Sequence, residues 1–191
     1  LFAALNVLEP LYEACLERMK GFLEEWGEHP KHRNYATFFR AIRDEIGKHP
    51  SPKYFIYKSI IIHNLYGVDI MKEAIEICKL RLFLKLVAQV DDVANIEPLP
   101  DIDFNIRAGN TLVGFATQEE MKRAMQGDLM AYKTVLPKVL DKARECNRLF
   151  SLFRKAQLEN DASLGQAKKT LQGKLNALEG KLNHYLAVDY G

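Results

Sequence analysis

Apolar residues in the first third of the chain recur every three or four positions, the spacing of amphipathic helices. Residues 1–25 carry one such stripe, which Pro10 interrupts and Gly27 and Pro30 end. Residues 34–47 carry a second stripe, which the segment His-Pro-Ser-Pro at 49–52 ends. Residues 53–62 are rich in aromatic residues and isoleucine, and their spacing favours a short helix over a strand. We therefore predict three consecutive helices.

Two short apolar runs follow, one on each side of another helix. Residues 64–70 and 104–110 are predicted strands, the first of them buried. Residues 72–88 are apolar nearly all round, which predicts a helix covered on most faces. Such a strand–helix–strand (βαβ) unit has two parallel strands and a right-handed crossover.

From residue 119 onward the pattern is helical. Residues 121–157 are predicted as one long helix, followed by a turn at 159–162. A heptad seam comes next, formed by Leu164, Leu171, Leu175, Leu178, Leu182 and Tyr185. We expect the two long helices to pair as an antiparallel hairpin. Gly173 and Gly180 fall opposite the seam, where we expect another surface to approach closely.

These elements predict an α/β fold dominated by helices, with two domains. Residues 1–118 form the α/β domain, including a helical segment at 27–62, and residues 119–191 form the helical hairpin. The composition agrees with a globular chain, because 48% of the 191 residues are hydrophobic and 27% are charged. Leu1 stands inside a helical pattern with no cap before it, so we expect the chain to be an excised piece of a longer protein.

Several function classes are disfavoured by what the sequence lacks. The three cysteines form no CxxC pair, and the five histidines show no HxH or HExxH spacing, so no metal site is predicted. No uncharged apolar run reaches the length of a membrane span, and no signal peptide is visible, so a cytoplasmic protein is expected. The net charge is +2, with 14 Lys and Arg against 16 Asp and Glu in residues 1–118 and 13 against 9 in 119–191.

The positive charge of residues 119–191 comes mainly from residues 121–157, where the cations include Lys138, Lys142, Arg144, Arg148, Arg154 and Lys155. A contact with phosphates is one interpretation of this bias, but a solvated helix face is the safer one. Two carboxylate pairs, Asp91 with Asp92 and Asp101 with Asp103, could bind a metal or act as acid and base. Loop solvation and helix capping are commoner roles for such pairs.

Two residues at the ends of the predicted strands are candidates for ligand binding. Asp69 follows an apolar run, where a carboxylate can accept hydrogen bonds from both ribose hydroxyls of a nucleotide cofactor. Its alternative role is to cap the helix that starts near Lys72. Asn110, within Gly109-Asn110-Thr111, would lie at the same sheet edge, where an amide can accept from an adenine amino group. The alternative is an ordinary turn.

Residues 63–115 resemble a known family. The segments NLYGVDIMKEAIEICKLRLFLKLV and EPLPDIDFNIRAGNTLVG are similar to the large N6-adenine DNA methyltransferases of type IIG restriction–modification systems and related phage-defence systems. The resemblance implies a partial Rossmann-like fold with S-adenosylmethionine as cofactor and DNA as partner. It also implies that Asp69 binds the cofactor ribose, that Ile70 packs on its adenine and that Asn110 lies beside the adenine amino group.

Two motifs of that family are absent from the chain: the glycine-rich cofactor motif Asp-Pro-x-x-Gly-x-Gly and the catalytic Asn-Pro-Pro-Tyr. We therefore expect no catalytic residue here, and a chain that is inactive without the missing parts of its own methyltransferase domain. An open strand edge left by those parts would favour self-association. Two alternatives stay open: a non-enzymatic helical interaction module, and another Rossmann-type nucleotide enzyme.

Overall fold

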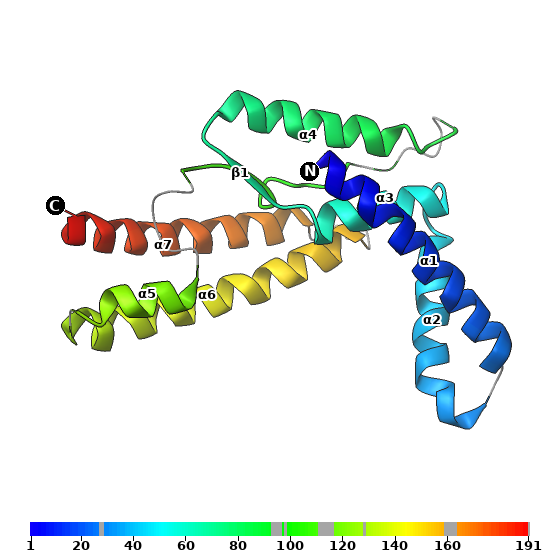
Figure 1. Ribbon diagram of the computed structural model, residues 1–191, viewed down its shortest axis with the longest axis horizontal. Helices are drawn as coiled ribbons and strands as arrows, with labels where there is room; N and C mark the ends of the chain where they lie inside the picture. The colour runs from blue at the N-terminus through cyan, green and yellow to red at the C-terminus, as the bar shows by residue number, and fades with distance from the viewer. Residues whose placement is uncertain are drawn as a thin grey trace. The chain divides into compact units, whose positions relative to one another are not determined.

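The computed structural model describes residues 1–26, 29–92, 97, 99–110, 117–127, 129–158 and 164–190, with the backbone alone at 30, 129–131 and 185–190. The chain divides into two compact units, Leu1–Gly109 and Asn110–Gly191. The first unit contains α1 (Phe2–Trp26), η1 (Pro30–His32), α2 (Arg33–Ile46), α3 (Pro52–His63), β1 (Gly67–Asp69), α4 (Lys72–Val87) and β2 (Ile106–Ala108). The second contains α5 (Gln118–Met125), α6 (Leu129–Leu158) and α7 (Leu164–Tyr190) (Figure 1).

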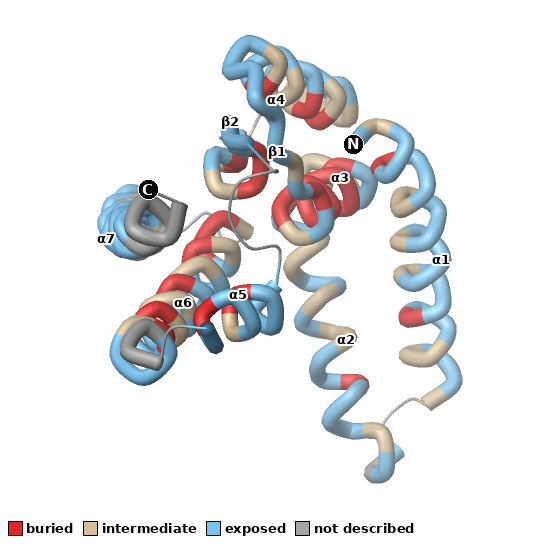
Figure 2. Tube along the Cα trace, turned by 60° about the vertical axis from the view of Figure 1, so that its left-hand side comes forward, coloured by how far each residue is buried: buried red, intermediate tan, exposed pale blue. Residues whose placement is uncertain are grey.

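The three helices predicted before residue 63 are confirmed, and the third of them is the core of the first unit. α3 begins after Ser51, whose hydroxyl accepts the backbone N–H of Tyr54 at 3.0 Å. The helix is buried along almost its whole length (Figure 2). Leu5 of α1 and Leu82 and Leu86 of α4 are fully buried in the same apolar cluster. α3 is therefore the element on which α1 and α4 pack, whereas α2 packs on α1.

The predicted strand–helix–strand unit is confirmed, with shorter strands than expected. β1 and β2 pair in parallel, with Gly67 opposite Ile106 and Asp69 opposite Ala108, and α4 connects them. The sheet has the two strands β1 and β2 within the described residues. The N–H of Gly67 donates to the carbonyl oxygen of Asn105 at 2.9 Å and thereby fixes the start of the register.

The expected burial of this unit is wrong in two places. The sequence predicts β1 as a buried strand, yet the side chain of Val68 is 53% exposed and Asp69 is exposed too. The sequence also predicts α4 to be covered on most faces, yet Ile77, Leu80 and Leu84 form an exposed apolar stripe. Apolar residues form both surfaces, as the sequence pattern indicates. In the described part of the chain, however, no strand pairs with the second edge of β1, and no element covers the stripe on α4.

The second unit differs from its prediction at one helix boundary. The sequence predicts one helix over residues 121–157, but α5 ends at Met125 and a turn at Gln126 and Gly127 precedes α6. The turn contains Gly127, and a glycine costs a helix about 1 kcal/mol relative to alanine. α5 also has its own start signal, a capping box in which Thr117 and Glu120 satisfy each other's backbone N–H groups. The predicted turn at 159–162 lies outside the described residues.

α6 and α7 lie side by side in this unit (Figure 1). Two members of the predicted seam, Leu178 and Leu182, pack against a cluster from α5 and α6 made of Met121, Met125, Leu136 and Val139. Glu145 of α6 forms an ion pair with Lys174 of α7 at 2.9 Å. The expected close approach at Gly173 and Gly180 is not found, because a Cβ atom at either would meet no described atom within 4 Å apart from the helix's own backbone. Throughout the described chain, no helix has the length and apolarity needed to cross a membrane.

Candidate cofactor-binding edge

The carboxyl ends of β1 and β2 form one edge of the small sheet. The backbone N–H of Gly109 donates to the carbonyl oxygen of Asp69 at 2.9 Å, which holds the two chain segments together just beyond the strands. A Cβ atom at position 109 would lie 3.3 Å from Cγ1 of Val68, so glycine suits this close approach. In open parallel sheets, ligands bind outside the carboxyl ends of the strands. Asp69 therefore stands where a cofactor could reach it.

The carboxylate of Asp69 has one structural role and spare acceptor capacity. Its Oδ1 accepts the backbone N–H of Met71 at 2.8 Å and so supports the turn into α4. Met71 itself, the N-cap residue of α4, makes no side-chain cap. Oδ2 has no hydrogen-bond partner among the described residues. Asp69 is therefore not the N-cap of α4, and its turn uses one of the two carboxylate oxygens, so the turn and ligand binding are compatible.

The two other predicted site residues lie at this end of the strands along the chain. Ile70 follows β1 and its side chain is 72% exposed, which leaves an apolar surface open beside Asp69. Asn110 follows Gly109, is exposed, and is the first residue of the second unit. Thr111, which the sequence pattern includes with Asn110, lies outside the described residues.

Asn105 is a buried residue that positions this edge and that sequence reasoning missed. It stands just before β2 and is 3% exposed. Its side-chain amide donates to the carbonyl oxygens of Ile62 at 3.0 Å and Leu65 at 3.1 Å, with Ile61 at 3.3 Å. These carbonyls lie at the end of α3 and in the segment that leads into β1. One amide group therefore fixes the start of both strands relative to the core.

A second polar cluster ties the segment before β2 to the helices. Oε1 of Glu97 lies 2.6 Å from Nδ1 of His49, and Oε2 lies 2.8 Å from Nζ of Lys58. The His49 and Lys58 side chains are each 1% exposed. Burial, together with the charge of Glu97, raises the pKa of nearby Tyr54 to about 12. This cluster satisfies buried charges and anchors residue 97 on α3, so its role is structural.

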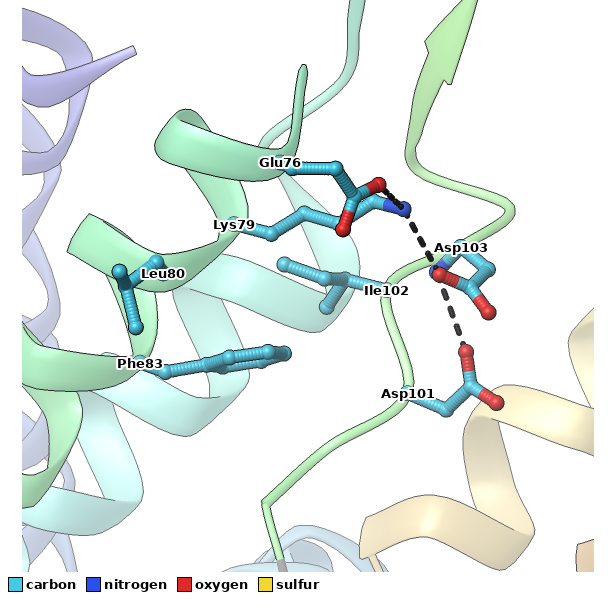
Figure 3. A pocket seen from close by; sticks show the side chains of 7 residues that line it. All are labelled: Glu76, Lys79, Leu80, Phe83, Asp101, Ile102 and Asp103. Carbon is cyan, nitrogen blue, oxygen red and sulfur yellow. Dashed lines mark hydrogen bonds and ion pairs between the residues drawn. The ribbon is translucent and has the colours of Figure 1, made fainter. Parts of the chain in front are cut away.

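A hollow of about 380 Å³ lies between α4 and the residues before β2 (Figure 3). Leu80, Phe83 and Ile102 form its apolar wall. Lys79 bonds to Asp103 at 2.8 Å and to Glu76 at 3.1 Å. Partial burial alone would lower the pKa of Lys79, but these two hydrogen bonds outweigh it and raise the pKa above its ordinary value.

The hollow lies at the amino end of β2, whereas Asp69 lies at the carboxyl end of β1, so the hollow and the candidate cofactor edge are separate. The predicted carboxylate pair at 101 and 103 belongs to the hollow. Asp101 accepts the backbone N–H of Asp103 at 3.1 Å, and Asp103 pairs with Lys79. Asp91 and Asp92 are exposed. No group of three His, Cys, Asp or Glu side chains suited to a metal occurs among the described residues.

Comparisons with known proteins bear on the same elements. The profile of the Eco57I restriction-modification methylase family matches residues 63–185, which include β1, α4 and β2 and most of the second unit. A protein of Methanocaldococcus jannaschii, named as a type II restriction enzyme and methyltransferase, is 50% identical over 66 residues. That match covers 31% of this chain and 6% of the relative. No solved structure matches the chain.

Proposed function

Because the chain belongs to the Eco57I restriction-modification methylase family, we propose that it is part of a DNA adenine-N6 methyltransferase of a restriction–modification or phage-defence system. The family match over residues 63–185 is the observation that carries this proposal. Membership favours an enzyme over the alternative of a non-enzymatic helical interaction module. DNA is the substrate of the proposed reaction, and the cytoplasm, where bacterial and archaeal DNA lies, is its proposed location.

The proposed cofactor is S-adenosylmethionine, which supplies the methyl group. Asp69 would accept hydrogen bonds from the ribose hydroxyls, and its oxygen without a partner in the described residues supports this role. Ile70 would pack on the adenine ring, and its exposure of 72% leaves the surface that such packing needs. Asn110 would accept from the adenine amino group. This set of side chains fits a nucleoside, because it combines two hydrogen-bond acceptors, a carboxylate and an amide oxygen, with an apolar side chain.

The proposed architecture is a partial Rossmann-like methyltransferase domain, residues 1–118, with an antiparallel helical hairpin, residues 119–191, inserted in it. The parallel pairing of β1 and β2 through α4 supports the first part. The hairpin is supported by contacts that run in opposite order along the two helices. Leu136 and Val139 share a cluster with Leu178 and Leu182, whereas the later residue Glu145 pairs with the earlier residue Lys174.

The chain alone is proposed to be inactive, because it contains neither the Asn-Pro-Pro-Tyr motif nor the glycine-rich cofactor motif of the family it resembles. An Asn-Pro-Pro-Tyr motif would hold the extruded target adenine. We therefore propose that the missing parts of the methyltransferase domain are partners of this chain, and that they complete the cofactor pocket around Asp69.

Methyl transfer by the full-length protein tests this proposal. The protein is incubated with mixed-sequence DNA and S-adenosylmethionine labelled in its methyl group, and the DNA is digested to nucleosides. We expect the label in N6-methyladenine and no label when the 191-residue chain replaces the full-length protein. Label in a cytosine derivative would contradict the adenine assignment. No transfer by the full-length protein would favour the interaction module instead.

A further inference from the structure

The exposed face of α6 carries a line of positive charges. Lys133, Arg144, Arg148 and Lys155 are all exposed. With 3.6 residues per turn, their positions fall within an arc of about 60° around the helix axis. At 1.5 Å per residue they extend over about 33 Å. We call these four residues the basic stripe.

The charge of α6 as a whole supports the importance of this stripe. The helix contains seven Lys and Arg residues but only two acids, Asp141 and Glu145. Asp141 pairs with Arg144 at 2.8 Å, and Glu145 pairs with Lys174 of α7. The hydrogen bond from Lys174 and the charges of Lys174, Arg148 and Lys142 lower the pKa of Glu145. Asp141 thus offsets one member of the stripe and Glu145 pairs with a cation of α7, but the cations of α6 still exceed its acids by five, seven against two.

The opposite face of α6 is occupied within its own unit. Leu136 and Val139 are buried in the cluster with α5 and α7. Large apolar residues that are exposed on the described part of this unit are Tyr132 and Leu152. A helix that binds a membrane surface inserts a broad apolar face, and α6 has no such face to offer in its described part. The partner that fits the stripe is instead a polyanion that is bound through its charge.

We propose that the basic stripe of α6 contacts the phosphate backbone of duplex DNA. This inference rests on the proposed function, which makes DNA the substrate. The length of the stripe, about 33 Å, is close to one helical turn of duplex, about 34 Å. Duplex DNA carries about one negative charge per 1.7 Å of axis, so a line of cations meets phosphates along its whole length. Such contacts orient the protein on DNA without reading the base sequence.

Two triple variants of the full-length protein test the stripe. K133Q/R144Q/R148Q removes three cations from the stripe. K20Q/K31Q/R33Q removes three exposed cations from α1, η1 and α2 and serves as the matched control.

Binding to a mixed-sequence duplex is measured over a series of salt concentrations. Each lost phosphate contact makes the slope of log K against log salt shallower by about 0.9. We expect a change approaching about 2.7 for the stripe variant, three times that value, and wild-type behaviour for the control.

Further readouts separate this inference from the proposed function. The stripe variant should raise the KM for DNA, leave kcat and the affinity for S-adenosylmethionine unchanged, and unfold at the wild-type temperature. If the wild type methylates DNA and the stripe variant binds DNA with the wild-type slope, α6 is merely a solvated helix and the inference is wrong, while the proposed function stands.

If the wild type transfers no methyl group, the proposed function is wrong. The difference in the slope of log K against log salt between the wild type and the stripe variant then decides whether the stripe binds DNA. Stripe-dependent binding to vesicles with anionic headgroups or to an acidic protein, with no stripe dependence for DNA, would also overturn the inference.

Discussion

A single buried amide, that of Asn105, fixes the start of both strands through the carbonyl oxygens of Ile62 and Leu65. Replacing Asn105 with Ala leaves those buried acceptors unpaired, which should lower the free energy of unfolding by about 1–3 kcal/mol. Asn105→Asp should cost more, because a carboxylate would face carbonyl oxygens. Urea unfolding of both variants and the wild type measures their free energies of unfolding, and we expect the lowest value for Asn105→Asp. A stability of Asn105→Asp equal to that of the wild type would show that this amide does not hold the strands.

The sequence indicates Asp69 but not Asn105, and the difference is physical. Asp69 follows an apolar run directly, so its place at the end of a strand is readable from local pattern. The role of Asn105 appears only when carbonyls from positions 61, 62 and 65 meet it in three dimensions. The same holds for Glu97, whose partners His49 and Lys58 lie 48 and 39 residues away in the chain.

At the scale of elements, the helices can be predicted because their apolar periodicity extends over many residues. The burial of a helix face cannot be predicted in the same way. The stripe of Ile77, Leu80 and Leu84 looks like core in the sequence and is exposed in the structure. Periodicity states which residues share a face, but what covers that face depends on elements elsewhere. The apolar pattern alone misses the break between α5 and α6, because Met125 and Leu129 keep helical spacing across the turn at residues 126 and 127.

The glycines of α7 offer a direct test of that helix. Gly173 and Gly180 lie inside it and are exposed, and a methyl group at either position would have no described atom within 4 Å apart from the helix's own backbone. Gly→Ala at each should therefore raise the free energy of unfolding by about 0.4–1 kcal/mol. Gly67→Ala is the control, because its Cβ would meet Leu1 Cδ1 at 3.3 Å. Destabilisation by Gly173→Ala or Gly180→Ala in chemical unfolding would mean that another surface covers them.

The contact of α1 with α3 should make stability depend on pH. The hydroxyl of Tyr57 donates to Glu9 at 2.6 Å, and this bond, with that from Lys53, holds the pKa of Glu9 below its ordinary 4.5. The stabilisation is therefore present above pH 4.5 and lost as pH falls through the folded-state pKa. Burial, then the bond to Glu9, raises the pKa of Tyr57 to about 12. The contribution of Tyr57 to the free energy of unfolding is therefore complete below pH 10 and is lost as pH rises toward 12.

Tyr57→Phe should flatten both limbs of this profile and cost about 1.5–3 kcal/mol near neutral pH, the contribution of a hydrogen bond to a charged group. Tyr12→Phe is the matched control for the acid limb, because the hydroxyl of Tyr12 donates to the neutral side chain of Asn64 at 2.7 Å. Thermal unfolding across the pH range measures both variants. An acid limb that is equally steep in the wild type and in Tyr57→Phe would rule out the assigned role of Glu9.

At the scale of the whole molecule, the apolar surfaces that the described chain leaves open predict self-association. The second edge of β1 has no paired strand in the described residues, and Val68 and Ile70 are exposed beside it. An apolar strand edge of this kind is a template for pairing. Light scattering of the isolated 191-residue chain should show a mass that rises with concentration. A monomer at every concentration, with the amides of β1 protected from hydrogen exchange, would contradict this prediction.

The central claim is that Asp69 holds the cofactor of a DNA methyltransferase, and calorimetric titration of the full-length protein with S-adenosylmethionine tests it most directly. Asp69→Ser is the informative variant, because a serine hydroxyl can still accept the N–H of Met71 and keep the turn into α4. It cannot accept two ribose hydroxyls as a carboxylate can.

We expect Asp69→Ser to bind S-adenosylmethionine about 10- to 100-fold more weakly, since a charge-assisted hydrogen bond contributes about 1.5–3 kcal/mol. Its unfolding temperature should match that of the wild type. Asp44→Ala, which removes an exposed carboxylate from α2, should leave the affinity unchanged. Equal affinity in the wild type and Asp69→Ser would contradict the account.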